Sequence, residues 1–253
     1  MVGGTAALPL PEPAMIDCPA AVRPPDSDPE DLADAAAEVV DCMRVLAKGG
    51  SNLVLEALGG REFIELEHYP PGDIHDPETH AQAYFHAHPP SPSRPHDFGH
   101  FHTFLRGPAL PPGAPPLDLA GNRLDRPAAE VTAHLIAIAM DNLGRPTALF
   151  TTNQWVTDET LYPAPVLTPL LPSFVLDLAH PSWPLNRWLT AMVVLFRPTI
   201  AALLAERDAA LARATVDAGV PLLQDRGVEV LSYRAIDLNA RLAEVRRVIG
   251  LEE

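Results

Sequence analysis

Two His-x-His pairs lie close together in the chain, one at His86 and His88 and the other at His100 and His102. Each pair falls within a short run of residues typical of a β-strand. Side chains two residues apart on a strand point to the same face, so each pair places two imidazoles side by side. If the two strands are neighbours and share that face, up to four imidazoles converge. Zinc, iron and copper ions bind such sets of nitrogen ligands, so the spacing predicts a transition-metal site at these four histidines.

The histidines are enriched locally, because seven of the ten lie between His75 and His102. His75, His80 and His96 stand among Asp, Glu, Pro and Ser in stretches typical of loops, where a solvated imidazole needs no function. For the two pairs, the alternative to a metal site is a polar strand face whose imidazoles bond neighbouring carboxylates and hydroxyls.

A site built from imidazoles also needs a carboxylate, either to complete an iron site, to orient a histidine or to accept a proton. Glu65 and Glu67 share one face of a strand predicted over residues 63–69, and Asp97 precedes the second pair by three residues. We predict Glu67 and Asp97 as catalytic residues. The alternative is that these carboxylates face solvent, as charged side chains usually do.

Glu65 and three further residues could support the metal ligands or bind a substrate. His68 lies near the end of the predicted first strand, His134 opens a later predicted strand, and Asn153 ends another. Each also has a structural interpretation. A buried strand histidine can be satisfied by one hydrogen bond, and an asparagine at a strand end can bond the adjoining turn.

The overall charge limits the partners of this protein. The 253 residues carry a formal net charge of −15 with a pI near 5.0, and no stretch gathers Lys or Arg into a patch. We therefore expect no binding to nucleic acid or to a membrane surface. Cys18 and Cys42 lack the spacing of a zinc knuckle or a disulfide framework, which predicts a reduced, cytoplasmic setting.

Residues 1–28 are predicted to form a flexible proline-rich leader, since they lack a basic region and prolines interrupt their apolar stretches. Residues 29–253 are then expected to form a single domain. The apolar stretch at 185–205 is about long enough to span a bilayer. It contains Arg187, Arg197 and Pro198, however, which instead predict two buried helices that meet at the proline.

Helical patterns occur at both ends of this domain. Asp28 and the proline after it predict a helix start, and apolar residues then recur at helical spacing until Gly49. A short second helix follows over residues 51–58. In the C-terminal third, helices are predicted over residues 185–196, 199–214 and 237–249, with a short strand at 228–231.

The middle of the chain consists of short β-type runs, at residues 63–69, 83–88, 99–105, 134–140 and 147–153. Turn residues at 141–146 predict a hairpin between the last two runs, so antiparallel pairing is expected. Residues 107–127 are rich in proline and predict a surface loop or lid. The whole pattern predicts an α+β fold, in which a central antiparallel β-sheet is flanked by N-terminal and C-terminal helices.

Five segments together resemble an uncharacterised bacterial domain family. They are HYPPGD at 68–73, YFHAH at 84–88, GHFHTFLR at 99–106, HLIAI at 134–138 and FTTNQWVT at 150–157. The resemblance covers roughly residues 30 to 245 and leaves the proline-rich leader outside. The family has no known function, so the resemblance implies neither an activity nor a set of catalytic residues.

These observations favour a metal-dependent enzyme that acts on a small molecule. Three or four of the paired histidines would hold one ion, with a position open either for water in a hydrolase or for oxygen in an oxidoreductase or oxygenase. Iron is favoured over zinc or copper, because the aromatic residues around the pairs suit a water-poor pocket.

Two other functions stay open. One is a non-catalytic metal store or sensor, in which four imidazoles saturate the ion. The other is a metal-free domain that binds a small ligand or a partner protein. The sequence leaves open whether the protein forms a homo-oligomer.

Overall fold

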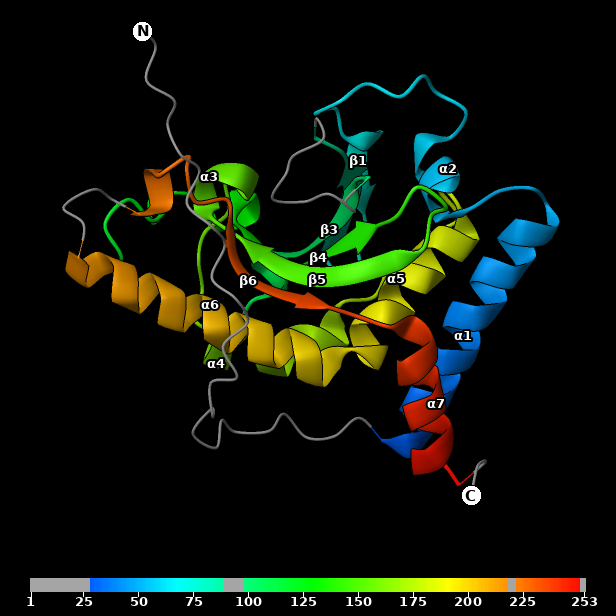
Figure 1. The fold of residues 1–253 in the computed structure, drawn as a ribbon. Coiled ribbons are helices and arrows are strands. Elements are labelled where there is room, and N and C mark those ends of the chain that lie inside the picture. The colour runs from blue at the N-terminus through cyan, green and yellow to red at the C-terminus, as the bar shows by residue number, and fades with distance from the viewer. Residues whose placement is uncertain (1–27, 89–97, 218–221, 251–253) are drawn as a thin grey trace, which may run out of the picture.

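The computed structural model describes residues 28–88, 98–217 and 222–250. Its centre is an antiparallel sheet of six strands that lie in chain order (Figure 1). The strands are β1 (Tyr69–His75), β2 (Ala81–His86), β3 (His100–Arg106), β4 (Thr132–Met140), β5 (Pro146–Thr152) and β6 (Val230–Ala235). The α-helices are α1 (Pro29–Lys48), α2 (Leu53–Leu58), α3 (Gln154–Thr157), α4 (Ala164–Leu167), α5 (Trp183–Leu195), α6 (Arg197–Asp217) and α7 (Leu238–Val248).

The predicted α+β fold is confirmed, and the helix ends follow the predicted signals. The Asp28 carboxylate accepts a hydrogen bond from the backbone N–H of Glu30, and α1 stops at Gly49. The Asn52 side chain caps α2, and the Asp237 side chain caps α7. Each cap satisfies a backbone N–H that the first helical turn leaves without a partner. The predicted leader lies outside the described residues except for Asp28.

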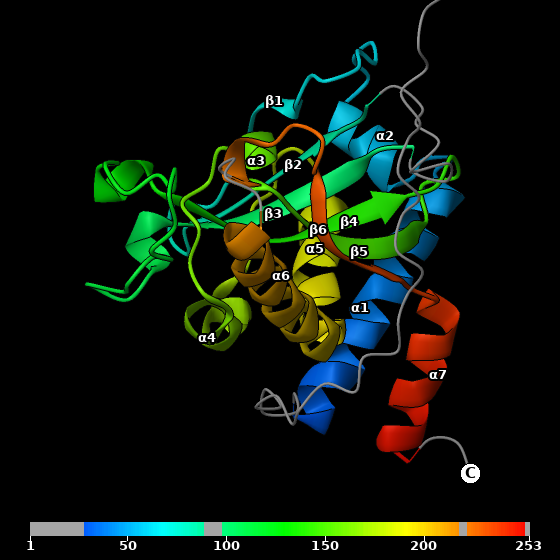
Figure 2. The same cartoon turned by 60° about the vertical axis from the view of Figure 1, so that its left-hand side comes forward.

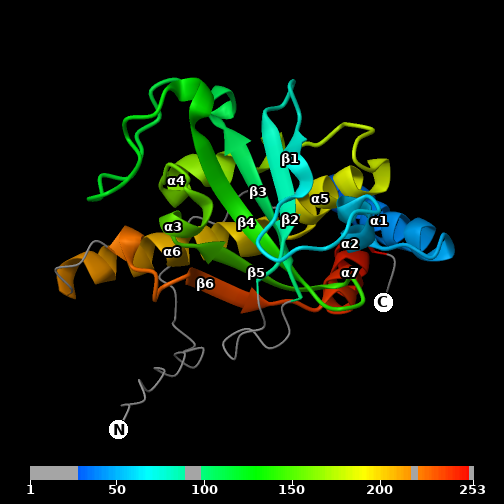
Figure 3. The same ribbon diagram turned by 90° about the horizontal axis from the view of Figure 1, so that it is seen from above.

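Helices cover one face of the sheet. Figures 1 and 2 show α5 and α6 crossing beneath the strands, with α1 beside α5. Seen from above in Figure 3, the strands lie in front of these helices. The main hydrophobic core fills the space between the two layers. Phe101 of β3 and Trp188 of α5 meet there, with ring centroids 6.0 Å apart.

The side chains of strands β2 and β3 point alternately to the two faces of the sheet. Phe85 and Phe101 belong to the core on the helix side. Tyr84, His86, His100 and their neighbours at even positions therefore point to the opposite face, because successive side chains alternate. In the antiparallel register, Tyr84 pairs with His102 and His86 pairs with His100. The two His-x-His strands are thus neighbours, as the site prediction requires.

The first predicted strand was wrong in its position. Residues 63–68 are irregular and exposed, and β1 begins only at Tyr69. Leu66 has a backbone φ of +68°, which the extended conformation of a strand excludes. The Tyr69 hydroxyl holds this segment by donating to the Glu62 carbonyl and accepting from the Ile64 N–H. Glu65 and Glu67 consequently lie outside the sheet.

The proline-rich stretch 107–127 is a surface loop with one short 3-10 turn, η1 (Gly107–Ala109). The Asn122 side chain bonds the carbonyl of Leu161, and Leu117 and Leu119 pack against the cluster around Leu161. The loop therefore lies at the end of the sheet where β3 stops. His86 and His100 lie at the other end of their strands, so these contacts do not make the loop a lid over them.

The described residues include no single helix with the length and apolar composition of a membrane span. Helices α5 and α6 satisfy that test only when taken together, and they are bent by 72° where they meet.

Candidate metal centre

Three buried imidazoles converge on the face of the sheet that lies opposite the helices. His86 ends β2 and His100 begins β3, directly across from it. The Nε2 atoms of His86 and His100 are 2.8 Å apart, and those of His86 and His102 are 3.2 Å apart. One ligand nitrogen from each of the three residues lies within 4.8 Å of the others. This triad could hold a metal ion.

The spacing of the triad suits first-row transition metals. Metal–nitrogen bonds of about 2.0–2.1 Å place two ligand nitrogens about 2.9 Å apart at a right angle and about 3.3 Å apart at a tetrahedral angle. The two Nε2 distances of His86 fall close to these values. The three donors therefore stand where small side-chain adjustments would complete three coordination bonds.

A glycine allows the two strands to approach so closely at the triad. Gly99 precedes His100 and has a φ of +127°. A Cβ at this position would lie 2.3 Å from Cζ of Phe85 and 2.9 Å from the carbonyl oxygen of His86. Any side chain would thus push β3 away from the end of β2, and the triad would separate.

Burial favours the protonation state of His102 that binds metals. His100 and His102 are fully buried, and His86 is 6% exposed. Burial holds the pKa of His102 well below its usual value, and repulsion from a charged His100, His134 or His86 lowers it further. A neutral imidazole is the metal-binding form, so the environment favours ligation over protonation.

The fourth predicted ligand lies beside the triad rather than in it. His88 follows the end of β2, and its half-buried ring contacts His86 and His100, with ring centroids 4.7 and 5.4 Å apart. Its Nε2 lies 3.6 Å from Oε1 of Glu229. Sequence reasoning missed Glu229, because this residue is distant in the chain and reaches the site only through the pairing of β6 with β5.

His134 supports the triad from β4. The residues that pair with β3 are Ile136 opposite Thr103 and then His134 opposite Phe104, so Leu135 is an extra residue in a β-bulge. Without this bulge, His134 would point to the helix side together with Ile136. Instead its Nε2 lies 3.0 Å from Nδ1 of His102. A metal-binding histidine usually bonds a second group through its other nitrogen, and His134 is placed to be that group.

A family model spans most of the chain, matching residues 33–236. The chain belongs to DUF6969, a domain family of unknown function. This result confirms the resemblance to an uncharacterised family. Searches of curated proteins and of solved structures gave no match. The function of this DUF6969 domain must therefore be argued from its site.

A buried acid lies behind His134 in this DUF6969 domain. Glu159 is fully buried, and its carboxylate accepts a hydrogen bond of 2.8 Å from the His134 backbone N–H. Burial raises the pKa of Glu159 to about 7, although the positive charge of Arg207 and the His134 N–H oppose this shift. Burial also lowers the pKa of His134 to about 3, and the charge of Arg207 adds to this effect.

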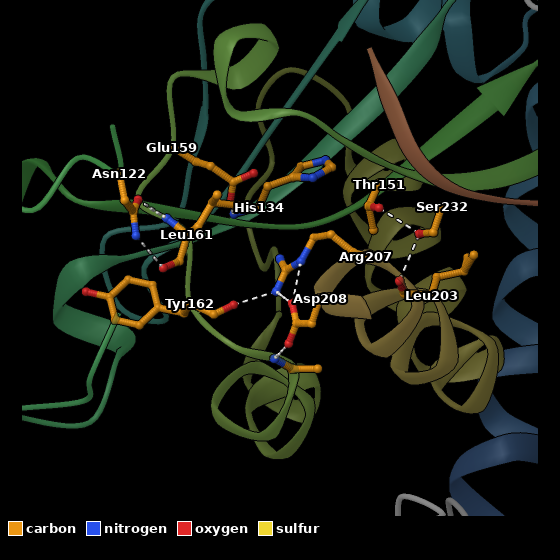
Figure 4. Close-up of polar contacts among 11 residues, drawn as sticks. Asn122, His134, Thr151, Glu159, Leu161, Tyr162, Leu203, Arg207, Asp208 and Ser232 are labelled. Atoms are coloured by element: carbon orange, nitrogen blue, oxygen red, sulfur yellow. Dashed lines mark hydrogen bonds and ion pairs between the residues drawn. The ribbon is translucent and has the colours of Figure 1, made fainter. Parts of the chain in front are cut away.

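Arg207 brings a positive charge into the same interior. It is 1% exposed, it lies below Glu159 and His134 in Figure 4, and it donates to the Tyr162 carbonyl and to the Asp208 carboxylate. Its Nη1 is buried and makes no hydrogen bond to any part of the chain that the structure describes. Glu159 and Arg207 lie in a loop and a helix without a recognisable motif, so the sequence offered no signal for them.

Of the remaining predicted site residues that the structure describes, none belongs to the triad. Glu65 and Glu67 are exposed in the irregular segment 63–68. Asp97 lies outside the described residues. Asn153 is buried, caps α3, and donates to the carbonyls of Leu222 and Val228. His68 remains at the site, with its ring stacked on Tyr84 at a centroid distance of 3.7 Å.

Proposed function

We propose that this protein binds one transition metal ion through His86, His100 and His102 and is a metal-dependent enzyme acting on a small molecule. The observation that carries the proposal is the convergence of three buried Nε2 donors from two adjacent strands. Three protein ligands leave coordination positions open, as in catalytic metal sites, whereas structural sites are usually closed by four. In an open position the ion would polarise or activate a bound water, oxygen or substrate atom.

Iron is the favoured metal, with zinc and copper as alternatives. The 2.8 Å separation of His86 and His100 suits an octahedral angle and the 3.2 Å separation of His86 and His102 suits a tetrahedral one, so these distances fit either iron or zinc. Phe150 lies against His100 with ring centroids 5.1 Å apart. Such aromatic surroundings suit an oxidoreductase or oxygenase, while zinc would favour a hydrolase.

A non-catalytic metal store or sensor is the second candidate, and the depth of the site favours it. His100 and His102 have no exposed surface and His86 is 6% exposed, so the described residues leave a substrate little access to the ion. A store would bind the metal without admitting a further ligand. Azide added to the iron-loaded protein separates the two functions, because only an open position gives a change in the absorption spectrum.

The first test is the metal content of protein purified without a histidine tag. We expect near one ion per chain in the wild type and less than a tenth of that in His102→Ala. The matched control is His88→Ala, which should keep its metal because the half-buried His88 lies outside the triad. Circular dichroism checks that all three proteins retain their helices.

Two results would refute the metal site. One is wild-type protein that takes up no Fe²⁺, Zn²⁺ or Cu²⁺ on reconstitution and shows no shift in melting temperature with any of them, since a ligand of the folded state must stabilise it. The other is a loss of metal from His88→Ala, and from the exposed-histidine variant His180→Ala, that is as large as the loss from His102→Ala.

A further inference from the structure

A chain of hydrogen bonds crosses three strands on the face that carries the triad. Arg106 Nη1 donates to Gln82 Oε1 at 3.0 Å, and Gln82 Nε2 donates to Asp73 Oδ2 at 2.7 Å. The other carboxylate oxygen, Asp73 Oδ1, lies 3.1 Å from His68 Nδ1. The chain thus connects the end of β3, through β2 and β1, to an imidazole outside the triad.

The direction of every bond in this chain follows from Arg106. A guanidinium can only donate, so the Gln82 amide must present its oxygen to Arg106 and its nitrogen to Asp73. The Asp73 carboxylate then accepts at both oxygens, and His68 Nδ1 carries a proton. In a neutral imidazole the other nitrogen is then an acceptor, so His68 Nε2 is a bare lone pair.

His68 lies beside the triad at its more exposed edge. Its ring stacks on Tyr84, which pairs with His102 across the strands. Its edge meets the ring of His86 at a centroid distance of 5.7 Å and an interplanar angle of 80°. The His68 side chain is 44% exposed, and no described residue bonds its Nε2. A small molecule bound next to His86 would therefore also lie near His68.

The backbone at Asp73 places its carboxylate between Gln82 and His68. Asp73 has a φ of +60°, in the left-handed region that Asp and Asn enter more readily than most other residues. Its side chain bonds Gln82 through one oxygen and His68 through the other.

We infer that His68 accepts a hydrogen bond from the substrate at the metal centre, and that the substrate accordingly carries a hydroxyl or N–H group next to its metal-binding atom. Arg106, Gln82 and Asp73 are positioning residues that place the N–H of the neutral His68 ring on Nδ1 and leave Nε2 as the acceptor. This inference rests on the proposed function for the metal, but its first half concerns the metal-free protein alone. If the chain only tied β1 to the sheet, the position of the proton on His68 would have no bearing on ligand preference.

The tautomer of His68 is testable without metal, by two-bond ¹H–¹⁵N correlation spectra of the labelled apo protein above neutral pH. The His68→Phe variant, which keeps the stacked ring, assigns the signals. We expect a proton on Nδ1 in the wild type. In Asp73→Asn, the new amide must offer its oxygen to Gln82 and its nitrogen to His68, so the proton should move to Nε2. Asparagine tolerates the positive φ, so this variant should fold.

A remote Asp141→Asn variant is the control, and its His68 signals should match those of the wild type. A wild-type protein with the proton on Nε2 would overturn the assignment, and so would an Asp73→Asn variant whose tautomer does not change.

Ligand preference is then measured on iron-loaded protein with two probes, acetohydroxamate and N-methylacetohydroxamate. Both chelate through the same two oxygens, but only the first has an N–H to donate. One hydrogen bond corresponds to about a fivefold difference in Kd. We expect the wild type to prefer acetohydroxamate by about that factor relative to Asp73→Asn, in which Nε2 is no longer an acceptor.

Equal preference in the two proteins would overturn the substrate assignment. If no metal binds at all, the proposed function fails and the substrate assignment fails with it, whereas the tautomer result for His68 still stands. The two failures are therefore distinguishable.

Discussion

The two faces of the central sheet are built from alternate residues of the same strands, yet burial has opposite consequences on them. On the helix side, Phe85 and Phe101 are buried among apolar side chains. On the other side, His100 and His102 are buried just as completely. Burying an aromatic ring among apolar groups stabilises the fold. Burying an imidazole lowers stability unless each nitrogen finds a partner.

We propose that the helix-covered face serves stability and that the opposite face serves metal binding. The Nε2 atoms of His100 and His102 lie 2.8 and 3.2 Å from that of His86, so one metal ion could bind all three. The helix-covered face needs nothing further. We therefore expect substitutions on the two faces to separate stability from metal binding.

The largest effect is expected from two adjacent residues of β3. Phe101→Ala should lower the free energy of unfolding of the metal-free protein by about 3–5 kcal/mol, because it leaves a cavity in the core. Its metal affinity should change little while the protein is folded. His100→Ala should reduce metal binding more than tenfold and affect apo stability far less. Urea denaturation and metal titration measure the two quantities for each variant.

The comparison of the faces fails if both variants lose metal binding equally when measured without urea, at a temperature where both are folded. It also fails if His100→Ala destabilises the apo protein as much as Phe101→Ala does.

Strand alternation made much of this arrangement predictable. The spacing of His86 and His88 and of His100 and His102 indicated one shared face, and the structure places three of them together. The sequence did not show that His88 would lie outside the triad. The rule of alternation holds only within a strand, and β2 stops at His86. The segment 63–68 misled for a related reason: its β-forming residues are interrupted by the left-handed Leu66.

The support behind the triad was beyond the sequence. His134 was recognised as a candidate, but strict alternation with Ile136 and Ile138 would have turned it toward the helices. Only the bulge at Leu135 aims it at His102. Bulges depend on pairing with a neighbouring strand rather than on a local signal. Glu159 and Arg207 likewise meet through tertiary contacts alone.

The second largest effect is expected from the buried carboxyl group of Glu159, which bonds the His134 backbone N–H. Its pKa in the folded protein is about 7, above the ordinary 4.5. Folding therefore favours the protonated form, and this contribution to stability is lost as pH rises from about 4.5 through about 7. The loss amounts to about 3 kcal/mol for such a shift. Glu159→Gln keeps an acceptor for the His134 N–H but cannot ionise.

We therefore expect Glu159→Gln to gain stability relative to the metal-free wild type as pH rises, by up to about 3 kcal/mol between pH 4.5 and 8. Taking the difference matters, because His102 and His134 have lowered pKa values and destabilise both proteins as pH falls below about 6.5. Urea denaturation across this range measures it, with the exposed Glu130→Gln as control. A difference that does not change with pH would show that Glu159 is already charged in the fold.

The smallest of the three effects concerns the contact between His134 and His102, and it sharpens what the imidazole face requires. His134→Phe preserves a buried ring on β4 but removes the partner of His102 Nδ1. Loss of such a supporting group typically weakens metal binding about ten- to a hundredfold. Metal titration in competition with a chelator measures the change, and Phe104→Leu, on the same face beside His134, controls for altered packing. If both variants bind metal equally well, the His134 contact serves only to satisfy a buried imidazole. A selective loss in His134→Phe would instead mean that the bulge at Leu135 exists to orient a ligand, because the same backbone without the bulge would leave His102 without this partner.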